Sequence, residues 1–160
     1  MDESSHRIAP NIKKGWYLRG KNTQTKINYT REKFYSFGAL GGNGIFYCKF
    51  YDAANTDCFL DFIESLQKQF GKVLLFADNV AYHKSNGVKK FLKKVKKDVV
   101  IKYFLPYTPE LNPIEIQWRD IKKSTANQYF SNCVEMRDII RCVLNSREVK
   151  VVKLFDYLTL

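Results

Sequence analysis

The chain has 160 residues, of which 45% are hydrophobic, and this is enough apolar material for a packed domain and excludes a disordered polypeptide. Its formal net charge of +11 indicates a polyanionic partner, with nucleic acid ahead of an anionic membrane surface. No run approaches the roughly 18 apolar residues of a membrane span. Residues 1–6 lack the pattern of a signal peptide, so we expect a cytoplasmic protein.

Residues 1–32 show little periodicity and predict a loop with short extended pieces. Asp2 is expected at the end of a central strand, but only Met1 precedes it, so the first strand is expected to be truncated. Without a repeat or a clear linker, residues 1–160 are expected to form a single domain.

Two aromatic runs, 34–40 and 45–51, are separated by Gly41-Gly42-Asn43-Gly44 and predict a β-hairpin. Apolar residues then recur at helical spacing over 56–70, and Gly71 provides the stop signal.

The run 73–77 is apolar throughout, which predicts a strand buried on both faces that ends at Asp78. A helix over 88–97 with its lysines outward leads to a strand over 99–105, and this order predicts a right-handed parallel crossover. A last helix is predicted over 133–146, capped by Asn132 with Glu135 and with these residues inward: Met136, Ile139, Ile140, Val143 and Leu144.

The four cysteines, Cys48, Cys58, Cys133 and Cys142, show no C-x-x-C spacing and lie among apolar neighbours. This pattern favours buried, reduced thiols over zinc ligands or disulfides.

A helix is predicted after the turns at Pro106 and Pro109, with Asn112 as N-cap and Pro113 at the first helical position. Glu115 follows Asn112 by three residues, which fits a capping box without any catalytic role. The alternative is a metal ligand.

The second interpretation needs other acids nearby. Asp78 and Glu115 can reach one edge of the sheet, and Asp2 can join them from a neighbouring strand. Carboxylates so close together require cations, and Mg²⁺ prefers oxygen ligands. Two such ions assist phosphodiester substitution by binding the attacking and the leaving oxygen. Alternatively, Asp78 caps the turn that follows it.

Two sequence motifs that contain the candidate ligands resemble motifs of a known protein family. D-N-x-x-x-H spans Asp78 to His83, and L-N-P-I-E-x-x-W spans residues 111–118, with 36 residues between Asp78 and Glu115. Together with D-E-S at residues 2–4, they resemble the catalytic core of the mariner superfamily of cut-and-paste transposases, in its prokaryotic insertion-sequence branch. The resemblance covers about residues 2–125.

The resemblance implies an α/β, RNase H-like fold with a mixed central sheet, an antiparallel hairpin plus parallel strands, and helices on both faces. It implies that Asp2, Asp78 and Glu115 form a catalytic triad holding two Mg²⁺ ions, with Mn²⁺ as a substitute. The expected reaction is cleavage at transposon ends and transfer of the 3′-hydroxyl into target DNA, typically at TA. A homodimer on DNA, near the nucleoid and without a small-molecule substrate, is expected. Members of the family carry an N-terminal helix-turn-helix region that recognises the transposon ends, and because only Met1 stands before Asp2 in this sequence, we do not expect the 160 residues alone to bind those ends specifically.

Basic residues near the acids are the candidate DNA contacts. Arg119, Lys122 and Lys123 share the helix of Glu115 and are the better phosphate contacts. Lys84, Lys89 and Lys90 are further candidates, although the lysines of 89–97 also fit a solvated helix face.

Four residues are candidates for a supporting role: Asn79, His83, Asn112 and Pro113. Asn79 is expected to shape the turn at Asp78. His83 orients substrate or an acid, or only caps and packs. Trp118 is expected in the core. Two alternative functions remain: a catalytically silent remnant that binds DNA or a partner subunit, and an RNase H-like nuclease without joining activity.

Overall fold

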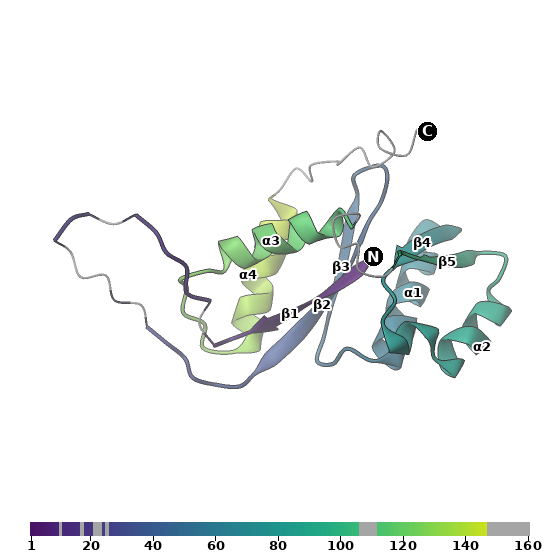
Figure 1. Cartoon of the computed structure of the whole chain (residues 1–160), viewed down its shortest axis with the longest axis horizontal. Coiled ribbons are helices and arrows are strands. Elements are labelled where there is room, and N and C mark those ends of the chain that lie inside the picture. Colours follow the sequence, from purple (N-terminus) through teal and green to yellow (C-terminus); the bar gives the residue numbers. More distant parts are fainter. Residues whose placement is uncertain (10, 17, 21–23, 25, 106–111, 147–160) are drawn as a thin grey trace.

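The computed structural model describes residues 1–9, 11–16, 18–20, 24, 26–105 and 112–146, and its strands and helices form a mixed α/β structure (Figure 1). In chain order the elements are β1 (Asp2–Arg7), β2 (Lys33–Leu40), β3 (Phe46–Tyr51), α1 (Thr56–Phe70), β4 (Val73–Ala77), the short 3-10 helix η1 (Ala81–Lys84), α2 (Asn86–Lys94), β5 (Val99–Tyr103), α3 (Ile114–Ser124) and α4 (Cys133–Asn145). None of these helices has the length and apolar character needed to cross a membrane.

The first three strands form an antiparallel sheet in the order β1-β2-β3. The predicted hairpin of β2 and β3 is confirmed, and its turn is closed by a hydrogen bond from the Gly41 amide to the Ile45 carbonyl at 2.8 Å. In the β1–β2 register Asp2 lies opposite Gly38.

Strands β4 and β5 form a parallel pair, as the strand, helix, strand order predicted. The start of β1 lies beside the end of β4, where the Met1 amino nitrogen donates to the Phe76 carbonyl at 2.5 Å. This contact brings Asp2 and Glu3 close to Asp78, which follows β4 directly.

Two hydrophobic clusters pack on opposite faces of β2. Phe37 points to one face, where it meets Phe62 and the rest of the cluster of α1, α2, β4 and β5. Phe34 points to the other face, toward α3 and α4. Residues 34 and 37 differ by an odd number of positions, so strand alternation sends them to opposite sides. The predicted helices on both faces are confirmed.

Strand β1 is one of the short extended pieces predicted at the start of the chain, but Asp2 begins this strand, and the prediction that it ends one was wrong. Asp2, Ser4 and His6 alternate inward, and the buried His6 side chain is bonded to the Ser36 hydroxyl at 2.8 Å. Residues 2–6 are all polar, so they lack the alternation of apolar and polar side chains by which a half-buried strand is recognised in a sequence.

The prediction that β4 is buried on both faces was also wrong, because Leu74 and Phe76 are 60% and 47% exposed. Val100 on the neighbouring strand is 44% exposed as well. In the part of the chain that the structure describes, α1 and α2 cover one face of this pair, while α3 and α4 pack on the other sheet.

The thiols are free, as predicted, but less buried than expected, and Cys142 is exposed. In α4, Met136 and Ile140 point inward, whereas Ile139 is exposed, contrary to prediction.

The capping predictions had different outcomes at the two C-terminal helices. At α4 the Asn132 side chain accepts from the Glu135 amide at 3.0 Å, so this cap is confirmed. At α3 the helix begins at Ile114 after Pro113, without a side-chain cap, so the prediction of Asn112 as N-cap was wrong, and the alternative of an Asn112–Glu115 capping box is not supported. The predicted turns at Pro106 and Pro109 lie outside the described residues.

Because the Asn132 side chain caps α4, whereas Asn112 caps no helix, Asn132→Ala is expected to lower the free energy of unfolding by about 1 kcal/mol. Asn112→Ala is the matched control. Its Oδ1 atom is buried and accepts no hydrogen bond, so its loss removes no cap and is expected to cost less. Urea unfolding measures both changes, and equal losses would contradict the assignment of the caps.

Candidate active site at the ends of β1 and β4

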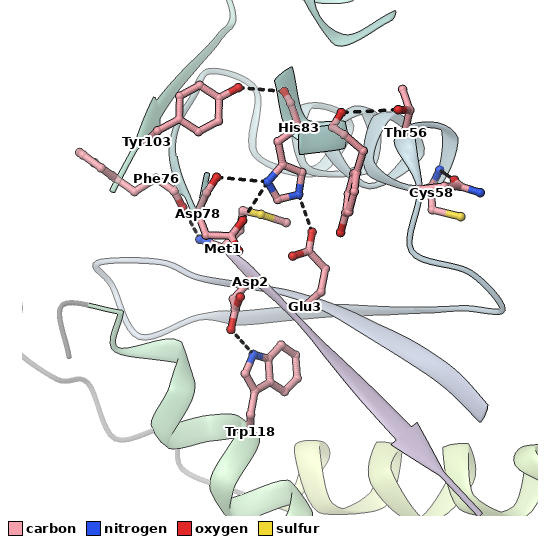
Figure 2. Close-up of polar contacts among 12 residues, drawn as sticks. Met1, Asp2, Glu3, Thr56, Cys58, Phe76, Asp78, His83, Tyr103 and Trp118 are labelled. Carbon is pink, nitrogen blue, oxygen red and sulfur yellow. Dashed lines mark hydrogen bonds and ion pairs between the residues drawn. The ribbon is translucent and has the colours of Figure 1, made fainter. Parts of the chain in front are cut away.

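Asp78 lies at the centre of the candidate site, half-buried immediately after β4 (Figure 2). Its Oδ1 atom is 3.0 Å from Nδ1 of His83, and the same ring nitrogen is 3.3 Å from the Asp78 carbonyl oxygen. Oδ1 is buried and has no well-aligned hydrogen bond. One oxygen of this carboxylate is therefore held in an ion pair with the His83 ring, although the geometry is not that of a well-aligned hydrogen bond.

His83 is fully buried in η1, where its ring stacks on Phe59 at a centroid distance of 4.0 Å. Its Nε2 atom is 2.8 Å from Oε1 of Glu3, so each ring nitrogen faces a carboxylate. Burial lowers the pKa of His83, but the bonds to Asp78 and Glu3 outweigh it and raise the pKa to about 9. His83 is therefore an imidazolium at neutral pH, and with both nitrogens protonated it cannot ligate a metal.

Glu3 is the site residue that the sequence analysis missed. One carboxylate oxygen of Glu3, one of Asp78 and one ring nitrogen of His83 all lie within 4.8 Å of one another. Figure 2 shows Glu3 and Asp2 on opposite sides of β1, because successive side chains of a strand alternate. The sequence does hold a signal for Glu3. A buried histidine that faces one acid also requires a partner at its second ring nitrogen, and Glu3 directly follows the candidate ligand Asp2.

Asp2 points to the other side of β1, toward α3, and its Oδ2 atom accepts a hydrogen bond from Nε1 of Trp118 at 3.0 Å (Figure 2). Burial, together with the charges of Glu115 and Glu3 and a smaller effect of Asp78, raises the pKa of Asp2 to about 7. The acids are thus near enough to repel one another, although Asp2 is not part of the cluster around His83.

Glu115 lies exposed in the first turn of α3, where its amide nitrogen donates to the Asn112 carbonyl at 3.2 Å. The structure therefore places Asp78 in the His83 cluster, and Asp2 and Glu115 on the α3 side. The triad assignment stays a prediction.

Asn79 ties the ends of β4 and β5 together. Its Nδ2 atom donates to the Phe104 carbonyl at 2.5 Å, and its Oδ1 atom accepts from Nζ of Lys84. The Lys84 ammonium also lies over the Tyr103 ring, 4.8 Å from its centroid. These contacts fix the turn that follows Asp78.

The other basic candidates lie on two surfaces. Arg119, Lys122 and Lys123 are exposed on α3, next to the side that Glu115 occupies. Lys89 and Lys90 are exposed on α2, whose lysines point outward as predicted. Figure 1 places α2 and α3 well apart along the long axis of the molecule. The α3 surface is the one adjacent to the acids.

The chemistry of the donors fits a hard divalent cation. Asp2, Asp78 and Glu115 offer carboxylate oxygens, the ligands that Mg²⁺ and Mn²⁺ prefer. The raised pKa of Asp2 indicates that positive charge is in short supply around this carboxylate.

Asp2 at the start of β1 and Asp78 after β4 form an acidic site at one edge of a mixed α/β fold. Sites at such sheet edges are typical of enzymes with this architecture. The model of the DDE superfamily endonucleases matches residues 1–137, and the chain belongs to this family. No curated protein matches the sequence at a significant level. The predicted family is thus confirmed at the level of the superfamily.

Solved structures of the Mos1 transposase share the fold. The Mos1 strand transfer complex has a TM-score of 0.73 at 16% identity, covering 97% of this chain and 49% of that chain. The Mos1 mariner paired end complex with Mn has a TM-score of 0.72 at 15% identity, covering 97% and 50%. The catalytic domain of Mos1 mariner transposase has a TM-score of 0.65 at 14% identity, covering 83% and 72%. The chain spans about half the length of the Mos1 chains in the complexes.

Proposed function

We propose that this chain is the catalytic domain of a DNA transposase that cleaves DNA at transposon ends and transfers the 3′-hydroxyl into target DNA. The observation that carries the proposal is that a buried imidazolium holds the Asp78 carboxylate directly after β4, in a chain of the DDE family. The Mos1 structures include a paired-end complex with a transposon end and a strand transfer complex, which supports DNA as the substrate.

We assign the metal ligands to Asp2, Asp78 and Glu115. Mos1 complexes with Mn and with Mg support a divalent cation here, and we propose two per site. Bound cations would neutralise the phosphodiester and lower the pKa of an attacking water or 3′-hydroxyl. A bound cation would also offset the burial and the repulsion that raise the pKa of Asp2.

The remaining residues orient the acids and the DNA. The Glu3–His83 pair keeps the Asp78 carboxylate in place, because the imidazolium is itself immobilised on Phe59. Arg119, Lys122 and Lys123 are the proposed phosphate contacts next to Glu115. A homodimer on paired ends and a TA target belong to the same proposal.

The test of the proposal uses the 160-residue chain with two DNA substrates. In Mn²⁺ we expect nicking of a supercoiled plasmid that carries the ends of the element, and none in EDTA. A duplex with a pre-cleaved 3′-hydroxyl end separates the alternatives, because a transposase joins it to a second DNA and a simple nuclease does not.

A silent remnant is the second candidate, and the observation that favours it is that Asp78 lies in the cluster around His83, whereas Asp2 and Glu115 lie on the α3 side. A remnant would bind DNA but show no Mn²⁺-dependent rise in melting temperature. A ligand that binds only the folded state raises that temperature. Absence of both the rise and the nicking would reject the transposase proposal.

A further inference from the structure

Helix α3 holds the Asp2 carboxylate through Trp118. The Trp118 ring is almost fully buried against Phe46, at a centroid distance of 5.6 Å, and its Nε1 atom donates to Oδ2 of Asp2 at 3.0 Å. Asp2 is only 8% exposed, so its charge has lost most of its contact with water. A donor at this place offsets part of the cost of burying a carboxylate.

Gly38 makes room for this contact. It lies opposite Asp2 in the β1–β2 register, directly beneath the indole. A Cβ atom at position 38 would lie 2.6 Å from Cη2 and 2.7 Å from Cζ2 of Trp118, closer than such atoms can approach. The glycine is therefore required by the ring above it.

The helix also links two acids. Glu115 and Trp118 are three positions apart on α3, so they lie on neighbouring positions of one helical surface. A shift of α3 would move the Glu115 carboxylate and the donor to Asp2 together. The N–H group distinguishes this role from packing, because a phenyl ring would fill most of the same space without donating.

We propose that Trp118 is a positioning residue, whose indole N–H sets the Asp2 carboxylate relative to Glu115 for binding of a divalent cation. The inference rests on the proposed function, since it takes Asp2 and Glu115 as ligands. Trp118 touches neither substrate nor cation in this role and acts only through Asp2.

The test compares Mn²⁺ affinity between Trp118→Phe and the parent chain, measured by calorimetric titration without DNA. Outer contacts of metal ligands typically contribute a factor of 10 or more, so we expect Trp118→Phe to weaken Mn²⁺ binding by about 10-fold. Trp16→Phe, at a fully exposed tryptophan, is expected to bind as the parent does.

Ile121→Val controls for a merely structural effect. Ile121 is buried on the same helix and has no polar group, so its truncation loosens the packing of α3 without removing a donor. We expect both variants to melt at a lower temperature and only Trp118→Phe to lose Mn²⁺ affinity. Should Trp118→Phe fail to fold, Gly38→Ala keeps the indole but displaces it, and the same loss of affinity is expected.

The outcomes separate the inference from the function. If the parent binds Mn²⁺ and Trp118→Phe binds it equally well, the inference is rejected and the proposed function stands. A loss of affinity in Ile121→Val as large as that in Trp118→Phe would also reject the inference, because packing would then explain it. A parent chain that binds no Mn²⁺ would reject both.

Discussion

Metal-dependent nicking by Asp78→Asn and by Glu115→Gln is expected to fall at least about 100-fold below that of the parent chain. Each change replaces a carboxylate by a neutral amide of the same shape, so it removes the charge that holds a cation while leaving the packing intact. Stabilisation by a bound cation is typically worth several kcal/mol, and each 1.4 kcal/mol corresponds to about a tenfold change in rate. Initial rates on plasmid DNA in Mn²⁺ measure the effect.

Glu64→Gln is the matched control for this loss. Glu64 is exposed on α1 and belongs neither to the proposed ligands nor to the cluster around His83, so its substitution is expected to leave nicking unchanged. Activity that survives in Asp78→Asn or Glu115→Gln would remove that residue from the proposed triad. A fall of the same size in Glu64→Gln would show that the assay reports loss of net negative charge and not loss of a ligand.

For the metal-free protein in EDTA, His83→Gln is expected to lower the free energy of unfolding by roughly 3 kcal/mol near pH 6.5 and by much less above pH 9. The pKa of His83 is raised from its ordinary 6.5 to about 9, so the folded state binds the proton more tightly than the unfolded state. The stabilisation is therefore fully present below pH 6.5 and is lost as pH rises through 9. Urea unfolding at pH 6.5, 8 and 9.5 measures it.

His6→Gln is the control, because His6 is also buried but burial lowers its pKa to about 4. His6 is neutral throughout this pH range, so its substitution is expected to change stability by a similar amount at each pH. The comparison is made between parent and variant, which cancels the titration of other groups. A loss in His83→Gln that does not vary with pH would mean that His83 packs as a neutral ring and does not hold Asp78 by charge.

The position of Asp78 directly after a strand was predicted correctly, because it depends only on neighbouring residues. A short apolar run that stops at an acid predicts a strand end, and β4 ends at Ala77 as predicted. For Glu115 the same local reasoning left two interpretations open, and the structure removed one of them, since α3 begins without a side-chain cap. The catalytic interpretation of Glu115 stays a prediction.

The surroundings of Asp2 and Glu3 could not be predicted from neighbouring residues. Residues 2–7 are polar and lie in a segment predicted as loop with short extended pieces. They form a strand because β2 offers backbone partners along its length and both faces receive side chains from distant helices. Which face each acid occupies depends on a strand register, and the register depends on the whole sheet.

The sequence alone determined the family, the order of most helices and strands, the position of Asp78 after β4 and the outward lysines of α2, because these depend on periodicity, turn residues and short motifs that lie close together in the chain. Only the tertiary structure decided that Glu3 joins Asp78 at His83 and that Asp2 turns to Trp118. These partners are separated by 80 and 116 residues, and no local pattern records a contact made by the packing of β1 against η1 on one side and α3 on the other.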